Sequence, residues 1–270
     1  MAARARKRHE QLAMFNARGT KADQRRGKAR GGRPRKTARG SAPHTKRKLE
    51  VRATWPVHVV LRVVDDVKGL RNRRIYKALR NASISALRQH DEILGSDEAA
   101  KIIHISIQQS HIHLIVEAPD QKALSRAMQG FKISAAKWIN RALSETRGKR
   151  RRGAVFAERY FAEVIKTPRQ ARNTLAYVLN NWRKHGEDKR QVARGWLVDP
   201  FSTGAVFGGW RELVGRDTQF RVRESYDSML VWLPESWLLK TGWRRHGAIG
   251  CREVPSSPAR TVAAGMATPE

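Results

Sequence analysis

The fold is decided by one stretch near the middle of the chain, residues 101–118, which reads KIIHISIQQSHIHLIVEA. Apolar and polar residues alternate in residues 101–108 and again in residues 111–118. Because side chains alternate across a strand, each half is predicted to be a strand with one apolar face. That face carries Ile103, Ile105 and Ile107 in the first strand, and Ile112, Leu114 and Val116 in the second. A tight turn joins them, which predicts an antiparallel hairpin with one face in the core.

Strand and helix patterns continue on both sides of this hairpin. Residues 56–64 and 159–166 are predicted strands, and residues 71–94 have apolar residues at helical spacing. A helix capped by Asp120 follows the hairpin, and a helix capped at Thr167, with Pro at its first position, is expected to end near His185. This order predicts an α+β, ferredoxin-like split βαββαβ fold with an antiparallel sheet and an appended C-terminal helix. Helices should cover one face of the sheet and leave the other free for a substrate.

The chain is predicted to divide into four parts. Residues 1–50 are a disordered basic arm, and residues 51–190 form the ferredoxin-like domain. Residues 191–252 are a Trp-rich tail, which either packs on the domain or stacks nucleic-acid bases. Residues 253–270 are expected to be disordered.

The composition favours a polyanionic partner. Lys and Arg number 55 against 24 Asp and Glu, a formal net charge of +31. Such an excess is costly through self-repulsion unless nucleic acid or an anionic surface is the partner. Basic residues are spread along the whole chain and no apolar run could span a bilayer, so no membrane partner is expected. Cys251 is the only cysteine, which excludes an internal disulfide and fits a reducing cytoplasm.

The basic arm contains a short motif, Gly32-Arg33-Pro34-Arg35-Lys36, that resembles an AT-hook. Arg33 and Arg35 would suit the narrow, negative A·T minor groove. The alternative is a plain solvated basic tail.

The chemistry is indicated first by His111 and His113, which share one face of the second hairpin strand. Two neutral imidazoles side by side can clamp a divalent metal ion. His104 faces the same way from the neighbouring strand, and Glu117 lies on the imidazole face. The alternative is a pair of strand histidines on a solvated face.

The second indication is Tyr177 on the last helix of the domain. Leu175, Val178, Leu179 and Trp182 form the apolar stripe of this helix. Tyr177 lies on the opposite side, with Asn173 and Asn181 one turn before and after it. Tyr177 and Asn181 are therefore predicted to face a metal held by the two histidines, although a surface tyrosine on an amphipathic helix is the alternative.

These residue types suit attack on a phosphodiester, whose oxygens are already negative. A divalent ion held by two His and an amide oxygen can polarise a phosphate oxygen and orient the scissile bond. The tyrosine hydroxyl can then attack phosphorus, giving a covalent 5′-phosphotyrosine and a free 3′-OH. Because the phenol pKa is about 10, the metal or a general base must assist its deprotonation.

Taken together, His111-Ile112-His113, Tyr160-Phe161-Ala162-Glu163 and Tyr177-Val178-Leu179-Asn180-Asn181 resemble the HUH single-tyrosine transposases. Within that family, residues 56–186 most resemble the REP-associated, IS200-like members. The resemblance implies nicking and rejoining of single-stranded DNA, near a small hairpin, with Mg²⁺ or Mn²⁺. It implies His111 and His113 as metal ligands, Tyr177 as nucleophile and Asn181 as the amide that completes the metal site. Ser110 and Trp182 depart from the family pattern, which indicates a divergent branch.

The remaining candidates are residues that would contact DNA or support the site. Backbone binding is predicted for Arg33, Arg35, Lys149, Arg150, Arg151, Arg152 and Arg159. Supporting roles are considered for His58, His104, Glu117 and Asn173. A bacterial cytoplasmic, nucleoid-associated protein is expected, acting as a monomer or as a homodimer.

Four other functions compete with the transposase. One is a structural role, such as that of a basic nucleoid protein, which would explain the charge but leave the joint placement of His111, His113, Tyr177 and Asn181 to coincidence. A domesticated or inactive protein on the same fold would bind hairpin DNA without cutting it. A non-catalytic protein whose sheet binds single strands by stacking on aromatics is disfavoured, because the strands are predicted to expose His, Ser and Gln rather than paired aromatics. A two-histidine phosphoesterase would use His104-Ile105-Ser106, but no second copy of that motif is found.

Overall fold

The computed structural model describes residues 49–93, 99–214, 220 and 226–255. Nearly all of the predicted basic arm, including Arg33 and Arg35, lies outside these residues, and so does almost all of the last segment. No helix in the described part of the chain is both long and apolar enough to cross a membrane.

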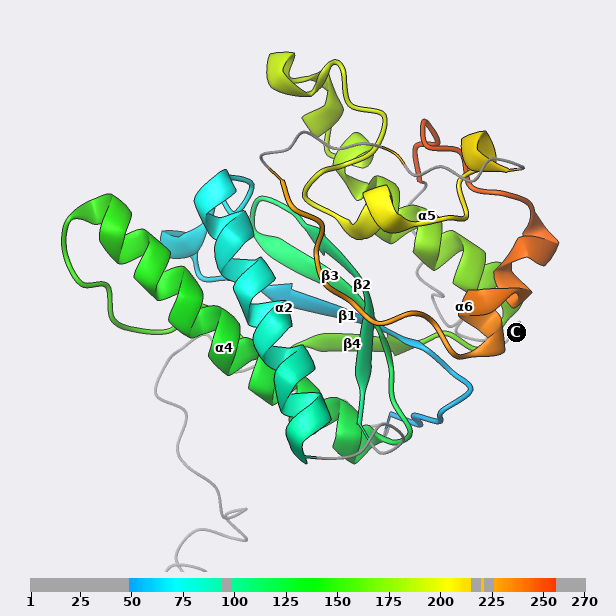
Figure 1. The fold of residues 1–270 in the computed structure, drawn as a ribbon, viewed down its shortest axis with the longest axis horizontal. Coiled ribbons are helices and arrows are strands. Elements are labelled where there is room, and N and C mark those ends of the chain that lie inside the picture. The colour runs from blue at the N-terminus through cyan, green and yellow to red at the C-terminus, as the bar shows by residue number, and fades with distance from the viewer. Residues whose placement is uncertain (1–48, 94–98, 215–219, 221–225, 256–270) are drawn as a thin grey trace, which may run out of the picture. The chain divides into compact units, whose positions relative to one another are not determined.

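The domain has the predicted ferredoxin-like order (Figure 1). Its elements are β1 (Val57–Arg62), α2 (Arg73–Ile93), β2 (Lys101–Ile107), β3 (His111–Glu117), α4 (Gln121–Arg147), β4 (Phe161–Val164) and α5 (Pro168–Lys184), followed by α6 (Trp237–Lys240) in the tail. The strands pair in the order β2-β3-β1-β4, and every pairing is antiparallel. The predicted α+β fold class is therefore confirmed.

The sheet separates two apolar cores. Helices α2 and α4 pack together on one face, over a core that includes Ile112, Leu114 and Val116. Helix α5 lies on the other face, where Ile115 of β3 packs with Leu175 and Leu179. The second core fixes α5 against β2 and β3, and this contact positions the candidate site.

The predicted helix ends are confirmed. The Asp120 carboxylate accepts the backbone N–H of Ala123 at 2.7 Å, and the Thr167 hydroxyl accepts that of Gln170 at 3.2 Å, so both helices start at side-chain caps. Pro168 occupies the first turn of α5. Gly186 takes φ of 67° just beyond the end of α5, a conformation that favours glycine.

The alternation predicted for β2 is wrong at Ile103. The pairing of β2 with β3 shifts register between Ile102 and His104, which is a β-bulge. Because the bulge adds one residue, Ile103 faces the α5 core while Ile105 and Ile107 face the α2 and α4 core. Sequence alternation cannot show such an extra residue.

The second face of the sheet is also less free than predicted, because the tail covers β2. The backbone N–H of Ile107 donates to the carbonyl of Phe201 at 2.9 Å, and the N–H of Trp232 donates to the carbonyl of Ile102 at 3.0 Å. His104, Ser106 and Gln108, which were expected to be exposed, are 7%, 0% and 2% exposed. Within the tail, Trp210 and Trp243 are buried against α5.

One buried ion pair fastens the tail to the domain. The Arg71 guanidinium donates to both carboxylate oxygens of Asp199 at 2.8 Å, and also to the carbonyl of Ile107 at 2.8 Å. The side chains of Arg71 and Asp199 are 4% and 0% exposed. Loss of Asp199 would leave the buried Arg71 guanidinium without its bidentate partner, facing only the carbonyl of Ile107 and the Glu187 carboxylate, which is 3.6 Å from Nε.

Asp199→Ala is therefore expected to lower the free energy of unfolding by about 3–5 kcal/mol, measured by urea titration followed by circular dichroism. Glu145→Ala is the control, since it removes the exposed Arg141–Glu145 pair and should cost no more than about 0.5 kcal/mol. Equal effects of the two substitutions would show that the Arg71–Asp199 pair does not hold the tail in place.

Candidate active site

Strand pairing brings three histidines to one face of the sheet. His111 and His113 alternate with the buried Ile112 along β3, and Arg62 and Val60 of β1 lie opposite them. His58 of β1 points to the same face two residues before Val60. The rings of His111 and His113 have centroids 4.7 Å apart, and those of His58 and His113 are stacked at 5.2 Å.

Helix α5 places Tyr177 over these rings. The Tyr177 ring lies 5.3 Å from that of His113 and 6.0 Å from that of His58, centroid to centroid, in edge-to-face geometry. Leu175, Val178 and Leu179 are buried in the second core, so the helix cannot turn without exposing them. The sequence-predicted nucleophile and metal ligands are therefore neighbours in space.

A histidine pair fixes which nitrogen of His113 is free. His58 Nε2 and His113 Nδ1 share a hydrogen bond of 3.0 Å, and both side chains are buried. His113 Nε2 is then buried with no hydrogen-bond partner among the described residues. A buried polar atom without a partner is costly, and such atoms concentrate where a ligand binds.

The imidazoles of the site are kept neutral. Burial is the main cause that lowers the pKa of His58 to about 4 and that of His111 to about 4. Electrostatic repulsion by His111 contributes at His58, and repulsion by His185 and Arg62 contributes at His111. Burial, reinforced by His58 and His111, holds the pKa of His113 well below its usual value. At neutral pH each ring keeps a nitrogen lone pair, which is the form that binds metal ions.

Asn181 lies one turn after Tyr177 and is fully buried. Neither atom of its amide makes a regular hydrogen bond among the described residues. Burial raises the pKa of the Tyr177 phenol above its usual value, and its interaction with the Asn181 side chain partly opposes this.

The donor set fits a divalent cation. Two neutral imidazoles, one with an unpartnered buried nitrogen, and an unpartnered amide oxygen offer nitrogen and oxygen ligands to Mn²⁺ or Mg²⁺. No group of three or more His, Cys, Asp or Glu suited to a metal occurs in the described residues. The candidate set accordingly depends on the Asn181 amide.

Sequence reasoning missed His185 and Lys184 at the end of α5. The His185 ring lies 5.9 Å from that of His111, and the Lys184 ammonium lies 5.1 Å from the centre of the Tyr177 ring. His185 follows Asn181 by four residues and so shares its side of the helix, which is the spacing that could have found it.

Three of the proposed supporting residues lie elsewhere or make other contacts. His104 Nδ1 is 2.9 Å from the Thr203 hydroxyl in the tail. The Glu117 carboxylate accepts the backbone N–H groups of Glu235 and Ser236 at 2.8 and 3.0 Å. Asn173 is exposed one turn before Tyr177. Only His58 of the four contacts the histidine pair of β3.

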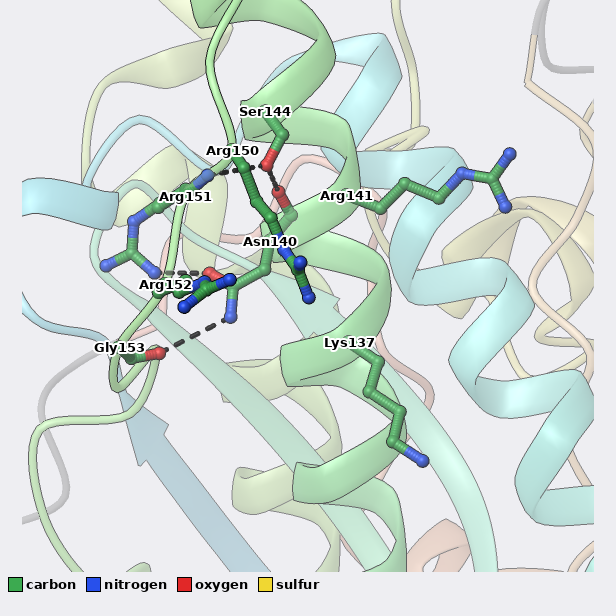
Figure 2. A pocket seen from close by; sticks show the side chains of 8 residues that line it. All are labelled: Lys137, Asn140, Arg141, Ser144, Arg150, Arg151, Arg152 and Gly153. Atoms are coloured by element: carbon green, nitrogen blue, oxygen red, sulfur yellow. Dashed lines mark hydrogen bonds between the residues drawn. The ribbon is translucent and has the colours of Figure 1, made fainter.

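The predicted basic loop forms one wall of a pocket of about 550 Å³ beside the end of α4 (Figure 2). Arg150 and Arg152 line it from the loop, and Lys137 and Arg141 line it from the helix. Of the other predicted DNA contacts, Lys149 and Arg159 are exposed and do not line this pocket.

Arg151 has a different role from its neighbours. Its side chain is 8% exposed, pairs with Asp66 at 2.9 Å, bonds the Asn140 side chain and donates to the carbonyl of Ala154 at 3.0 Å. The Asn140 amide also donates to the carbonyl of Gly153 at 3.3 Å (Figure 2). These contacts fix the loop, so that Arg150 and Arg152 are presented on a rigid frame.

Comparisons with known proteins match the part of the chain that contains this site. Residues 56–181 match the family described as "Transposase IS200 like". A solved REP-associated tyrosine transposase bound to a REP hairpin is 17% identical, with a TM-score of 0.45 over 69% of this chain and 98% of that chain. A putative transposase from Deinococcus radiodurans is 11% identical, with a TM-score of 0.33 over 55% of this chain and 98% of that chain. No curated protein matches the sequence.

If the role of Asn181 is to bind a ligand rather than to stabilise the fold, replacing it should not lower the free energy of unfolding. Asn181→Leu has similar volume and removes two unpartnered buried atoms, so the free energy of unfolding in chelator-containing buffer should rise by about 1 kcal/mol. Its neighbour provides the control, since Asn180 Nδ2 donates to the carbonyl of Gly250 at 2.9 Å. Asn180→Leu should lower the free energy of unfolding by about 1–3 kcal/mol. A loss of stability in Asn181→Leu that matches this would assign Asn181 to the core.

Proposed function

We propose that this chain, whose residues 56–181 form an IS200-like transposase domain, cuts and rejoins single-stranded DNA through Tyr177. The proposal is based on one observation: the half-buried phenol of Tyr177 lies beside the neutral imidazole of His113, one helical turn from the buried amide of Asn181, which has no hydrogen-bond partner among the described residues. A tyrosine and two strand histidines, far apart in sequence, come together at this one place.

The reaction attributed to Tyr177 is an in-line displacement at phosphorus. A bond forms between the tyrosine oxygen and phosphorus while the bond from phosphorus to the 3′-oxygen breaks. The phenol proton leaves, and the departing 3′-oxygen takes up a proton. The product is a 5′-phosphotyrosine and a free 3′-OH, and attack by a 3′-OH reverses the step without ATP.

The surroundings of Tyr177 affect this step in opposite directions. Burial opposes it, because it raises the pKa of the phenol, so loss of the proton must be assisted. The Lys184 ammonium over the ring would stabilise the developing negative charge. The packing of α5 holds the hydroxyl in place, which reduces the entropy lost on reaching the transition state.

His111, His113 and Asn181 would hold the divalent ion, Mg²⁺ or Mn²⁺. When bound, the ion supplies charge stabilisation at a phosphate oxygen. His58 orients His113 through the hydrogen bond to Nδ1, as partners of metal-binding histidines commonly do. These roles rest on the donor set described above.

DNA binding is attributed to the basic surfaces. The pocket formed by Lys137, Arg141, Arg150 and Arg152 would contact the phosphate backbone, as would the predicted basic arm. The solved transposase that resembles this chain is bound to a REP hairpin, and a hairpin is proposed as the target here too. A homodimer is compatible with this proposal but not required by it.

A two-histidine phosphoesterase is disfavoured by the position of His104. This ring is buried beneath the tail and bonded to Thr203, so it has no open surface for a substrate. A hairpin-binding protein that has lost cleavage shares the fold and the basic surfaces, and the following experiment separates it from the transposase.

Purified protein mixed with single-stranded DNA from the flanks of its own gene should form a covalent adduct that survives a denaturing gel. Tyr177→Phe should reduce the adduct at least about a thousandfold and leave hairpin affinity unchanged, because only the nucleophilic oxygen is lost. Chelation should abolish the adduct, and Mn²⁺ or Mg²⁺ should restore it. Tyr160→Phe is the control, since its hydroxyl contacts Ser125 of α4. Hairpin binding without any adduct would support the inactive protein instead.

Arg150→Ala combined with Arg152→Ala should weaken hairpin binding and lower the slope of log affinity against log salt by about 1.5, because two phosphate contacts are removed. Fluorescence anisotropy at several salt concentrations measures this. Arg244→Ala combined with Arg245→Ala removes the same charge from the tail and is the control. An unchanged slope in the first variant would exclude the pocket from the DNA interface.

A further inference from the structure

An exposed aromatic ring lies on the same face of the sheet as the histidines. Phe161 of β4 is 61% exposed, more than any other aromatic residue that the structure describes. Its neighbours Ala162 and Val164 pack on the α2 and α4 core, so Phe161 points the other way. Glu163, on the same side as Phe161, contacts Gln170 of α5, which confirms the face.

Strand register places this ring in line with the candidate site. Val60 of β1 is the pairing partner of both His113 in β3 and Phe161 in β4. The three residues therefore form one row across the sheet, and Phe161 is about 10 Å from His113 because strands are about 4.8 Å apart. Arg62 is exposed in the adjacent row, opposite His111.

The exposure of Phe161 is not explained by folding. An exposed aromatic on an edge strand contributes little to the core and favours unwanted association. The tail and α5 cover the β2 side of this face, but they leave Phe161 open. A ligand with both a flat apolar surface and negative charge would suit the ring and the nearby Arg62.

We propose that Phe161 stacks on an unpaired base of the DNA strand whose phosphate Tyr177 attacks. This inference rests on the proposed function and adds a base-binding position to it. Every base has a π-face, so stacking holds a single strand whatever its sequence. A base fixed on Phe161 and a phosphate at Tyr177 would set the direction of the strand across the β1 and β4 side of the sheet.

The test uses the uncleaving Tyr177→Phe protein, without divalent metal, and single strands that carry 2-aminopurine at successive positions around the cleavage site. One position should show quenched fluorescence on binding. Phe161→Ala should abolish that quenching and weaken binding about 5- to 150-fold, whereas Phe161→Trp should retain both. An abasic nucleotide at the same position should weaken binding by the parent but not by Phe161→Ala.

Leu233→Ala is the control, because Leu233 is 85% exposed on the segment that pairs with the opposite edge strand, β2. Unchanged quenching and affinity in Phe161→Ala would overturn the inference. So would a self-associating parent that becomes monomeric in Phe161→Ala without change in DNA binding, which would make the ring a contact between copies. Neither of these outcomes would prevent adduct formation through Tyr177. Failure of the Phe161 inference is therefore distinguishable from failure of the proposed function.

Discussion

The structure depends on the register between β1 and β3. Antiparallel pairing of β1 with β3 brings the His58 ring beside the His113 ring, and the two rings share a hydrogen bond of 3.0 Å. A slip of one residue would send His113 into the α2 and α4 core and Ile112 onto the site face. The apolar residues of β3 forbid that slip, because Ile112, Leu114 and Val116 are all fully buried. Hydrophobic burial therefore enforces the position of the polar site.

The sequence was sufficient to predict the helices and strands of the domain and the principal residues of the candidate active site. Period-two alternation predicted the hairpin, and Asp120 and Thr167 predicted the starts of two helices through their capping hydrogen bonds. The position of Tyr177 off the apolar stripe of α5 predicted that it is not an ordinary core residue, and in the structure its ring lies beside that of His113. These signals are local, so they can be read along the chain.

What could not be predicted depends on contacts between distant residues. The bulge at Ile103, the covering of β2 by the tail and the pairing of Arg71 with Asp199 arise only when the chain has folded. His58 resembled any strand histidine until pairing placed it against His113. Arg151 could not be told from Arg150 and Arg152 by sequence, yet its hydrogen bonds make it part of the framework.

The central claim is that a divalent ion binds within reach of the Tyr177 phenol, and paramagnetic broadening tests it most directly. Protein with isotope-labelled tyrosine rings is titrated with substoichiometric Mn²⁺, and Tyr177→Phe identifies the signal of that ring. Tyr177 should be broadened first and more strongly than Tyr160, and His113→Ala should remove this difference. Uniform broadening of all tyrosines, or a Tyr177 signal that stays sharp while Mn²⁺ binds, would contradict it.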